Sequence, residues 1–397
     1  MKTLEQVDLK GKRVLVRVDF NVPTDDQGTI TDATRVRAHL PTIAYIIEKR
    51  GKVILASHLG RPKGKRNEKY TLKPVVAKLS DLLFRDVAFV GDCVGAEAEA
   101  AVAAMKEGDV LLLENLRFYP GEEKNDPEFS KGLARLCDVY VDDAFATAHR
   151  GHASNAGITA FVGECAVGML LKSELDYLKR VTENPARPLV AIIGGAKVSD
   201  KIGVLEKLIE RVDKLIIGGG MAFTFLKAQG CEVGKSLCEQ DMLDVARRIM
   251  DKAKTAGVKL YLPVDAVVAE EAKADAATRP VSVQEIPPLL MGLDIGPATA
   301  SLFSEALQGA KTIVWNGPMG VFELAPFSTG TFAMAMAVAA ADALSIVGGG
   351  DTDTAIHQAG VADRISYIST GGGAFLELLE GKPMPAVEAL ERCGGAS

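Results

Sequence analysis

Residues 188–201 read PLVAIIGGAKVSDK. An uninterrupted apolar run over 189–193 ends in a glycine pair, and two lysines follow before the next helical pattern. An apolar run without polar alternation predicts a strand buried on both faces, which is typical of parallel α/β sheets. The same unit recurs along the whole chain, so it decides the fold class.

Apolar runs of strand length alternate with helical patterns in both halves of the sequence. They predict an α/β protein with two doubly wound, Rossmann-like parallel-sheet domains facing across a cleft. In the first half the runs cover 13–20, 52–60, 87–92, 109–118 and 138–145, and in the second half 188–195, 214–220, 259–265, 311–318, 344–351 and 365–373.

A connecting helix is predicted between the halves, over residues 167–183. It places Leu171, Leu175, Leu178 and Val181 on one face, and the prolines of NPARP end it. The expected organisation is a domain over 1–166, the hinge helix 167–183, a domain over 184–376 and a C-terminal segment 377–397. A single larger domain is the alternative.

Composition excludes several classes of protein. With 46 Lys+Arg against 52 Asp+Glu and a net charge of −6, a surface for nucleic acid is not expected. No apolar run has the length of a membrane helix and no signal peptide is recognisable, so we expect a cytoplasmic protein that binds no membrane. The six cysteines lack metal-ligand spacing, and we expect reduced thiols.

Strand ends in the first half carry cationic and polar side chains, which meet at one edge of a parallel sheet. Several arginines there predict a site for a small ligand with several negative charges; solvated surface arginines are the alternative. His39 is expected inside a helix, and Arg17 in a buried ion pair. The candidate residues are Asp19, Asn21, Arg35, His58, Arg61, Arg117, His149, Arg150 and His152.

Strand ends in the second half carry glycine instead, which allows a ligand to approach the backbone closely. This pattern predicts a nucleotide site, although turns between strands and helices use glycine anyway. Lys197 is expected at the strand-to-helix turn and Lys201 one turn later on the same face. Asp351 is the candidate ligand for Mg²⁺. GCEVGKS at 230–236 resembles a phosphate loop, but its spacing is wrong and it follows a helical segment.

A series of motifs resembles the phosphoglycerate kinase family, in the family's order and over nearly the whole chain. They are RVDFNVP, SHLGRPKG, LLENLRF, TAHRGHAS, GGAKVSDKIGVL, IIGGGMAFTFLK, MGLDIGPAT, VWNGPMGVFE, GGGDT and STGGGAFLELLEGK. The resemblance implies reversible phosphoryl transfer between 1,3-bisphosphoglycerate and ADP, giving 3-phosphoglycerate and MgATP, in glycolysis. It also implies a monomer whose C-terminal segment packs back on the first domain.

The resemblance implies roles for individual residues, carried over by position. Glu323 is expected to accept hydrogen bonds from the ribose, and the helix that begins at Gly372 and Gly373 to face the transferring phosphoryl group. Phosphoglycerate is expected at Asp19, Phe20, Asn21, Arg35, His58, Leu59, Gly60, Arg61, Arg117 and Arg150. The nucleotide is expected at Gly195, Lys197, Lys201, Gly219, Gly292, Asn316, Glu323, Gly349, Gly350, Asp351 and Thr352.

The chemistry implied by the family needs no general base, because a carboxylate acceptor is already ionised at neutral pH. Charge compensation on the transferring oxygens is expected from Lys197 and Arg35 with Mg²⁺, and hinge closure is expected to exclude water. Where the family usually reads VNDAF, this chain has Asp142 and Asp143. A two-lobed solute-binding protein and a different α/β kinase are the rival interpretations.

Overall fold

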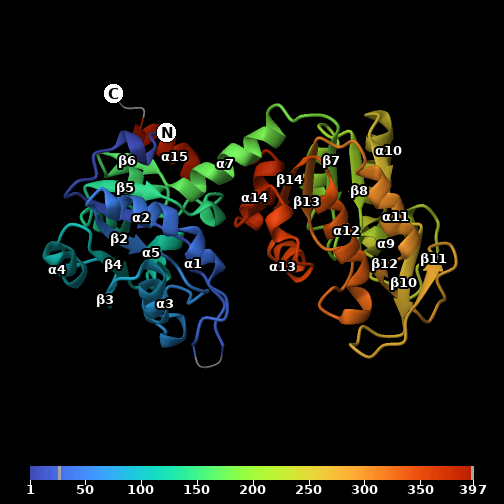
Figure 1. Ribbon diagram of the computed structural model, residues 1–397, viewed down its shortest axis with the longest axis horizontal. Coiled ribbons are helices and arrows are strands. Elements are labelled where there is room, and N and C mark those ends of the chain that lie inside the picture. The colour runs from blue at the N-terminus through green and yellow to red at the C-terminus, as the bar shows by residue number, and fades with distance from the viewer. Residues whose placement is uncertain (26–27, 395–397) are drawn as a thin grey trace. The chain divides into compact units, whose positions relative to one another are not determined.

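The computed structural model describes residues 1–25 and 28–394 (Figure 1). The chain forms two compact units. Unit 1 comprises residues 1–176 together with the segment that starts at Lys382, and unit 2 comprises Tyr177–Gly381. The boundary between them lies inside one helix, α7 (Met169–Thr182).

Unit 1 is built on a parallel sheet with the strand order β3-β4-β2-β1-β5-β6. Its strands are β1 Arg13–Arg17, β2 Lys52–Ala56, β3 Ala88–Val90, β4 Val110–Leu113, β5 Val139–Asp142 and β6 Cys165–Val167. Its helices are α1 Thr34–Ala38, α2 Leu40–Glu48, α3 Lys73–Leu83, α4 Ala96–Ala104, α5 Pro120–Glu123, α6 Pro127–Ala134 and α15 Pro385–Gly394, with short 3₁₀ turns η1 Leu4–Gln6, η2 Glu68–Tyr70, η3 Leu116–Phe118, η4 Phe145–Thr147 and η5 Gly157–Ala160.

Unit 2 is built on a second parallel sheet, ordered β15-β14-β13-β7-β8-β9. Its strands are β7 Leu189–Ile193, β8 Lys214–Ile217, β9 Lys259–Tyr261, β13 Thr312–Asn316, β14 Leu344–Gly348 and β15 Tyr367–Ser369. Its helices are α8 Ile202–Leu208, α9 Met221–Ala228, α10 Leu243–Thr255, α11 Pro297–Ala306, α12 Thr329–Ala340, α13 Gly350–Gln358 and α14 Gly373–Leu379, with 3₁₀ turns η6 Gln240–Met242, η7 Ala325–Phe327 and η8 Ala362–Arg364.

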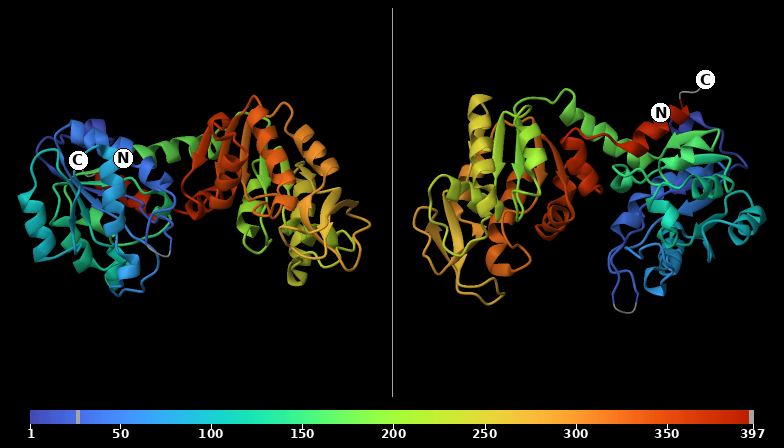
Figure 2. Two further views of the ribbon diagram at one scale, coloured as in Figure 1. Left: turned by 60° about the horizontal axis from the view of Figure 1, so that its bottom comes forward. Right: turned by 180° about the vertical axis from the view of Figure 1, so that it is seen from behind.

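The apolar runs form the cores of the two sheets, as predicted. Every residue of β7 and of β13 is buried, and helices cover both faces of each sheet (Figures 1 and 2). Burial on both faces removes the requirement for a polar face, which explains the uninterrupted apolar pattern. The predicted fold class, two parallel-sheet α/β domains, is confirmed.

A third, antiparallel sheet in unit 2 was absent from the sequence prediction. Its strand order is β11-β10-β12, with β10 Asp265–Ala269, β11 Arg279–Ser282 and β12 Met291–Ile295. β11 is largely exposed and contains Pro280, and β12 contains a glycine and an aspartate. Neither strand carries a continuous apolar run, so the pattern that revealed the parallel strands was missing here.

The C-terminal segment belongs to unit 1, where α15 contacts β6 and η5 (Figure 1). The Ala386 N–H donates to the Ala148 carbonyl at 3.2 Å. A disulfide joins Cys393 on α15 to Cys165 on β6. The expectation of six reduced thiols is therefore wrong, because the return of the chain brings together two cysteines that are 228 residues apart.

Candidate functional site

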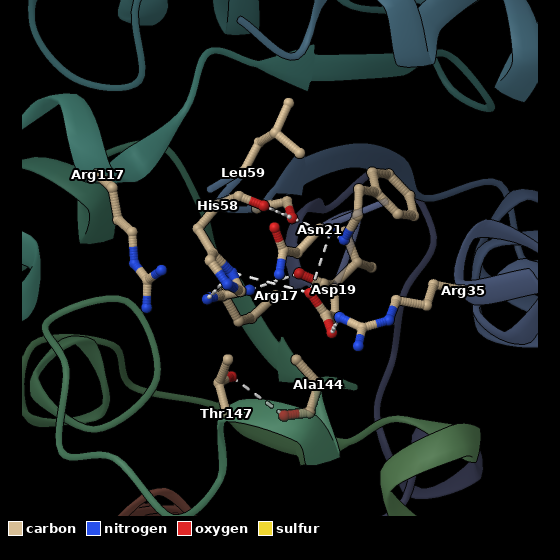
Figure 3. A network of polar contacts seen from close by, with 12 residues as sticks. Arg17, Asp19, Asn21, Arg35, His58, Leu59, Arg117, Ala144 and Thr147 are labelled. Carbon is tan, nitrogen blue, oxygen red and sulfur yellow. Dashed lines mark hydrogen bonds and ion pairs between the residues drawn. The ribbon is translucent and has the colours of Figure 1, made fainter. Parts of the chain in front are cut away.

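Asp19 lies just beyond the carboxyl end of β1 and is the centre of the polar network in unit 1 (Figure 3). Arg35 Nη1 donates to Asp19 Oδ2 at 2.7 Å. The Asp19 side chain is buried, while Arg35 remains partly exposed. This single bond leaves most of the five N–H donors of the guanidinium available to a ligand.

The loop after β2 is fixed from two sides. Asn21 Oδ1 accepts the Gly60 N–H at 2.8 Å, and Arg117 Nη1 donates to the Gly60 carbonyl at 2.8 Å. Arg117 also lies 3.1 Å from Glu123. These contacts join the ends of β1, β2 and β4, as expected for residues that follow neighbouring parallel strands.

His58 lies in a strongly positive environment. Its Nδ1 is 3.3 Å from Arg17 Nη2 and 3.8 Å from Asp19 Oδ1. Its pKa lies well below the usual range, mainly because the ring is buried. The guanidinium groups of Arg17, Arg117, Arg150 and Arg35 lower it further. Several cations gathered around a buried imidazole favour a ligand that brings several negative charges.

The other predicted residues of unit 1 fall into two groups. Phe20 and Leu59 are buried, and Arg150, half-buried, donates from Nε to His149 Nε2 at 3.1 Å. Burial lowers the pKa of His152 to about 3, with further contributions from Arg17, Arg117 and Arg150. Arg61, by contrast, is exposed. The structure thus gathers most of the predicted anion-binding residues into one network.

Unit 2 contains a cavity of about 490 Å³ beyond the ends of β7, β8 and β13. Its walls include several of the predicted nucleotide residues, namely Gly195, Gly219, Gly292, Glu323 and Asp351. Apolar side chains form much of the remainder, namely Phe223, Leu237, Met291, Leu293 and Val321. An apolar cavity with a few polar groups at its rim is typical of a small-molecule site.

Two glycines of this cavity are required by the close approach of neighbouring groups. Gly219 has a φ of +68°, and a Cβ there would lie 2.6 Å from the backbone N and O of Gly195. A Cβ on Gly292 would lie 2.1 Å from the ring of Phe223. Close packing therefore requires glycine both after β8, at Gly219, and within β12, at Gly292.

Polar contacts tie the remaining strand ends of unit 2 together. Lys201 Nζ donates to Asn316 Oδ1, and Asn316 Nδ2 donates to the Gly348 carbonyl at 2.6 Å. The Gly317 N–H donates to Thr352 Oγ1 at 2.7 Å. Burial lowers the pKa of Lys201. α13 and α14 begin at Gly350 and Gly373, where the glycine motifs predicted helix starts.

The expected helical spacing of Lys197 and Lys201 is wrong. α8 begins only at Ile202, so Lys197 lies in the loop before it and is exposed. Glu239 explains the extended loop, because its carboxylate accepts the N–H groups of Val198 at 2.6 Å and Ser199 at 3.1 Å. The loop is held by Glu239 rather than by helical hydrogen bonds.

Sequence reasoning missed part of both sites. The segment 230–236 follows α9, as predicted, but its Lys235 lines the cavity, and Ser236 Oγ accepts the Gly292 N–H at 2.9 Å. In unit 1, Arg17 donates to Ser154 Oγ at 2.8 Å and reaches His58. A charged residue inside an apolar strand was the available signal for Arg17.

Within 1–25 and 28–394, no helix is long and apolar enough to cross a bilayer. The same part of the chain holds no group of three or more His, Cys, Asp or Glu side chains arranged to hold a metal ion.

Comparison with known proteins gives one consistent answer. The family model for phosphoglycerate kinase matches residues 4–382. The phosphoglycerate kinase of Citrifermentans bemidjiense is 59% identical over 387 residues, which cover 98% of this chain and 97% of the relative. That of Thermosynechococcus vestitus is 57% identical over 391 residues and 98% of each chain.

Solved structures agree with this result. The phosphoglycerate kinase of Coxiella burnetii superposes with a TM-score of 0.89 at 46% identity, covering 98% of each chain. That of Pyrococcus horikoshii OT3 superposes with a TM-score of 0.88 at 34% identity, covering 99% of each chain. The chain belongs to the phosphoglycerate kinase family, whose activity is the reversible transfer of a phosphoryl group between 1,3-bisphosphoglycerate and ADP to give 3-phosphoglycerate and ATP.

Proposed function

We propose that the arginine-rich network of unit 1 binds the phosphoglycerate and that the cavity of unit 2 binds the adenine nucleotide. The main support for placing phosphoglycerate in unit 1 is the group of arginines around His58. Burial and these guanidinium groups lower the pKa of His58. 3-Phosphoglycerate carries a carboxylate and a phosphate, which match these positive charges. The substrate-binding residues are Asp19, Phe20, Asn21, Arg35, His58, Leu59, Gly60, Arg61, Arg117 and Arg150.

The nucleotide fits the polar rim and apolar walls of the cavity. Phe223, Leu237 and Val321 offer apolar surface to a base, and Glu323 offers a carboxylate to ribose hydroxyls. Lys197 and Lys201 extend from the loop after β7, where they can balance phosphate charge. The further nucleotide residues are Gly195, Gly219, Gly292, Asn316, Gly349, Gly350, Asp351 and Thr352.

Magnesium is the cofactor that we propose, held by Asp351 together with the nucleotide. Asp351 lies in the first turn of α13 and lines the cavity, which fits an ion bound through one carboxylate and the substrate phosphates. When bound, Mg²⁺ neutralises charge on the phosphate oxygens.

The transfer step needs positioning and charge compensation. In the ATP-consuming direction, a carboxylate oxygen of 3-phosphoglycerate attacks the γ-phosphorus, the bond to the bridging oxygen breaks, and ADP leaves. The carboxylate is already ionised at neutral pH, so no residue must remove a proton. We assign Lys197 and Arg35 to the transferring oxygens, with the start of α14 at Gly372 and Gly373 assisting.

Motion about α7 is part of the proposal, because the two ligands bind to different units. Closure would bring them together and exclude water, so that transfer is faster than hydrolysis. We further propose that the protein acts as a cytoplasmic monomer and requires neither nucleic acid nor a membrane.

A coupled assay tests the activity and the site together. Purified protein with 3-phosphoglycerate and MgATP should form 1,3-bisphosphoglycerate, detected through reductive dephosphorylation by a coupling enzyme. Arg35→Ala and Lys197→Ala should each lower kcat by about 10³-fold, as for other groups that stabilise a transferring phosphoryl group.

Two control variants show whether the loss of kcat depends on removing a positive charge at the proposed site or on removing any nearby positive charge. Arg37→Ala removes an exposed arginine from the same short helix as Arg35, and Lys207→Ala removes a lysine from α8. Both controls should keep kcat within about twofold, the usual range for surface changes. Near-normal kcat in Arg35→Ala or Lys197→Ala would contradict the assigned role.

A further inference from the structure

His39 lies between α1 and α2 and is fully buried, although none of the proposed roles uses it. Its Nε2 is 2.8 Å from the backbone N of Asp19, and its Nδ1 is 2.7 Å from Asp143 Oδ2. Asp143 is also fully buried. The imidazole therefore bridges the backbone of the substrate loop and a carboxylate from the end of β5.

The two partners determine which nitrogen carries the proton. A backbone N–H can only donate, so Nε2 must accept the bond from Asp19. A carboxylate accepts, so Nδ1 must donate to Asp143. An imidazole that accepts at one nitrogen and donates at the other is neutral and is protonated on Nδ1.

The other carboxylate oxygen of Asp143 is also hydrogen-bonded. Its Oδ1 accepts the N–H groups of Leu170 at 2.9 Å and Leu171 at 3.4 Å, in the first turn of α7. The ring of Phe20 packs edge-on to the imidazole, with 5.8 Å between centroids. The ring of His39 is therefore fixed by hydrogen bonds at both nitrogens and by packing on its side.

We propose that His39 is a positioning residue for the substrate site. By fixing the backbone of Asp19, it fixes the carboxylate that accepts the 2.7 Å bond from Arg35, and so it orients the guanidinium toward the ligand. This inference rests on the proposed assignment of Asp19 and Arg35 to the substrate.

Two substitutions each remove one of the two hydrogen bonds that His39 makes with Asp19 and Asp143. In His39→Asn, the amide nitrogen takes the place of Nδ1 and can still donate to Asp143, but nothing accepts the Asp19 N–H. In His39→Gln, the amide oxygen takes the place of Nε2 and can accept that N–H, while the donor to Asp143 is lost. The pair tests which bond serves the substrate.

The expected result is a difference in KM for 3-phosphoglycerate. His39→Asn should raise it about tenfold, the effect of one buried hydrogen bond, and His39→Gln should keep it within about threefold. Neither variant should change KM for MgATP, which binds to unit 2. An equal rise in both variants, or no rise in His39→Asn, would overturn the proposal.

The protonation of the His39 ring in the wild-type protein gives a readout besides kinetics. Nitrogen-15 NMR of the five histidines at neutral pH should show one buried, neutral ring protonated on Nδ1, which is missing from the spectrum of His39→Gln. A cationic ring, or one protonated on Nε2, would overturn the bridge.

Asp19→Ala distinguishes failure of this inference from failure of the site assignment. If Asp19→Ala raises KM for 3-phosphoglycerate and His39→Asn does not, the positioning role alone is wrong. If Asp19→Ala leaves KM unchanged, the assignment of the substrate site is wrong, and the positioning role is overturned with it.

Discussion

Asp142 is a fully buried carboxyl group at the end of β5. Burial is the main cause that raises its pKa to about 7. Its Oδ1 accepts the Ala144 N–H at 2.9 Å, which the amide oxygen of asparagine could also do. Between about pH 4 and 7 the folded chain therefore keeps a proton that the unfolded chain has released, so stability falls as the pH rises through this window.

Asp142→Asn should remove this loss, because an amide does not ionise. At pH 8 the variant should be more stable than the wild type by on the order of 2 kcal/mol, and near pH 4 the difference should disappear. Urea unfolding at both pH values measures this. Asp241→Asn, at an exposed site, is the control and should show no such dependence. A gain of equal size at both pH values would exclude ionisation as its cause.

At the scale of single residues, the sequence predicted those side chains whose place follows from topology. Asp19, His58 and Arg117 follow neighbouring parallel strands, so they had to meet at one sheet edge. The role of His39 could not be predicted, because it depends on an aspartate 104 residues away in sequence. The apolar wall of the cavity was missed because its residues come from segments that are far apart in sequence, from Phe223 to Val321.

At the scale of elements, the turn between β8 and α9 lies close to the loop after β7, at the wall of the unit 2 cavity. Gly219 and Gly360 share a φ of +68°, but only Gly219 has neighbours within 4 Å of an added Cβ. Substitution of either glycine by alanine should cost about 1–2 kcal/mol for the left-handed backbone. Gly219→Ala must in addition displace Gly195.

Gly219→Ala should therefore raise KM for MgATP by about tenfold or more, while Gly360→Ala should not change it. Steady-state kinetics with varied MgATP, together with the unfolding midpoints, separates the two effects. Equal KM values in the two variants would show that the close approach to Gly195 does not shape the nucleotide site.

Elements were predicted well where burial imposes a simple pattern. The buried parallel strands read as uninterrupted apolar runs, and α7 buries Leu171, Leu175, Leu178 and Val181, the four residues predicted to share a face. The sheet formed by β10, β11 and β12 was missed, because β11 is largely exposed and β12 is interrupted by a glycine and an aspartate. The helical spacing of Lys197 and Lys201 was predicted wrongly, because α8 begins only at Ile202 and contacts with Glu239 hold the loop before it.

At the scale of the whole molecule, the disulfide joins Cys165 and Cys393, which are separated by 228 residues in sequence. In the chain-entropy account, a cross-link of this span should stabilise unit 1 by roughly 5.5 kcal/mol. Cys393→Ser should lower the urea midpoint of oxidised protein, and reductant should lower that of the wild type to a similar value. Cys231→Ser, which removes a free thiol, should respond to reductant as the wild type does.

If motion about α7 brings the proposed sites together, then 3-phosphoglycerate with a nucleotide should reduce the radius of gyration more than either ligand alone. Small-angle scattering measures this directly. Unchanged scattering with both ligands bound would argue against closure.

The return of the chain to unit 1 through α15 also has a consequence for biosynthesis. Unit 2 is contiguous in sequence, from Tyr177 to Gly381, whereas unit 1 needs the segment after Lys382. During translation, every residue of unit 2 leaves the ribosome before the strand β6 can receive α15. The first half of this enzyme to be synthesised is therefore the last to be completed.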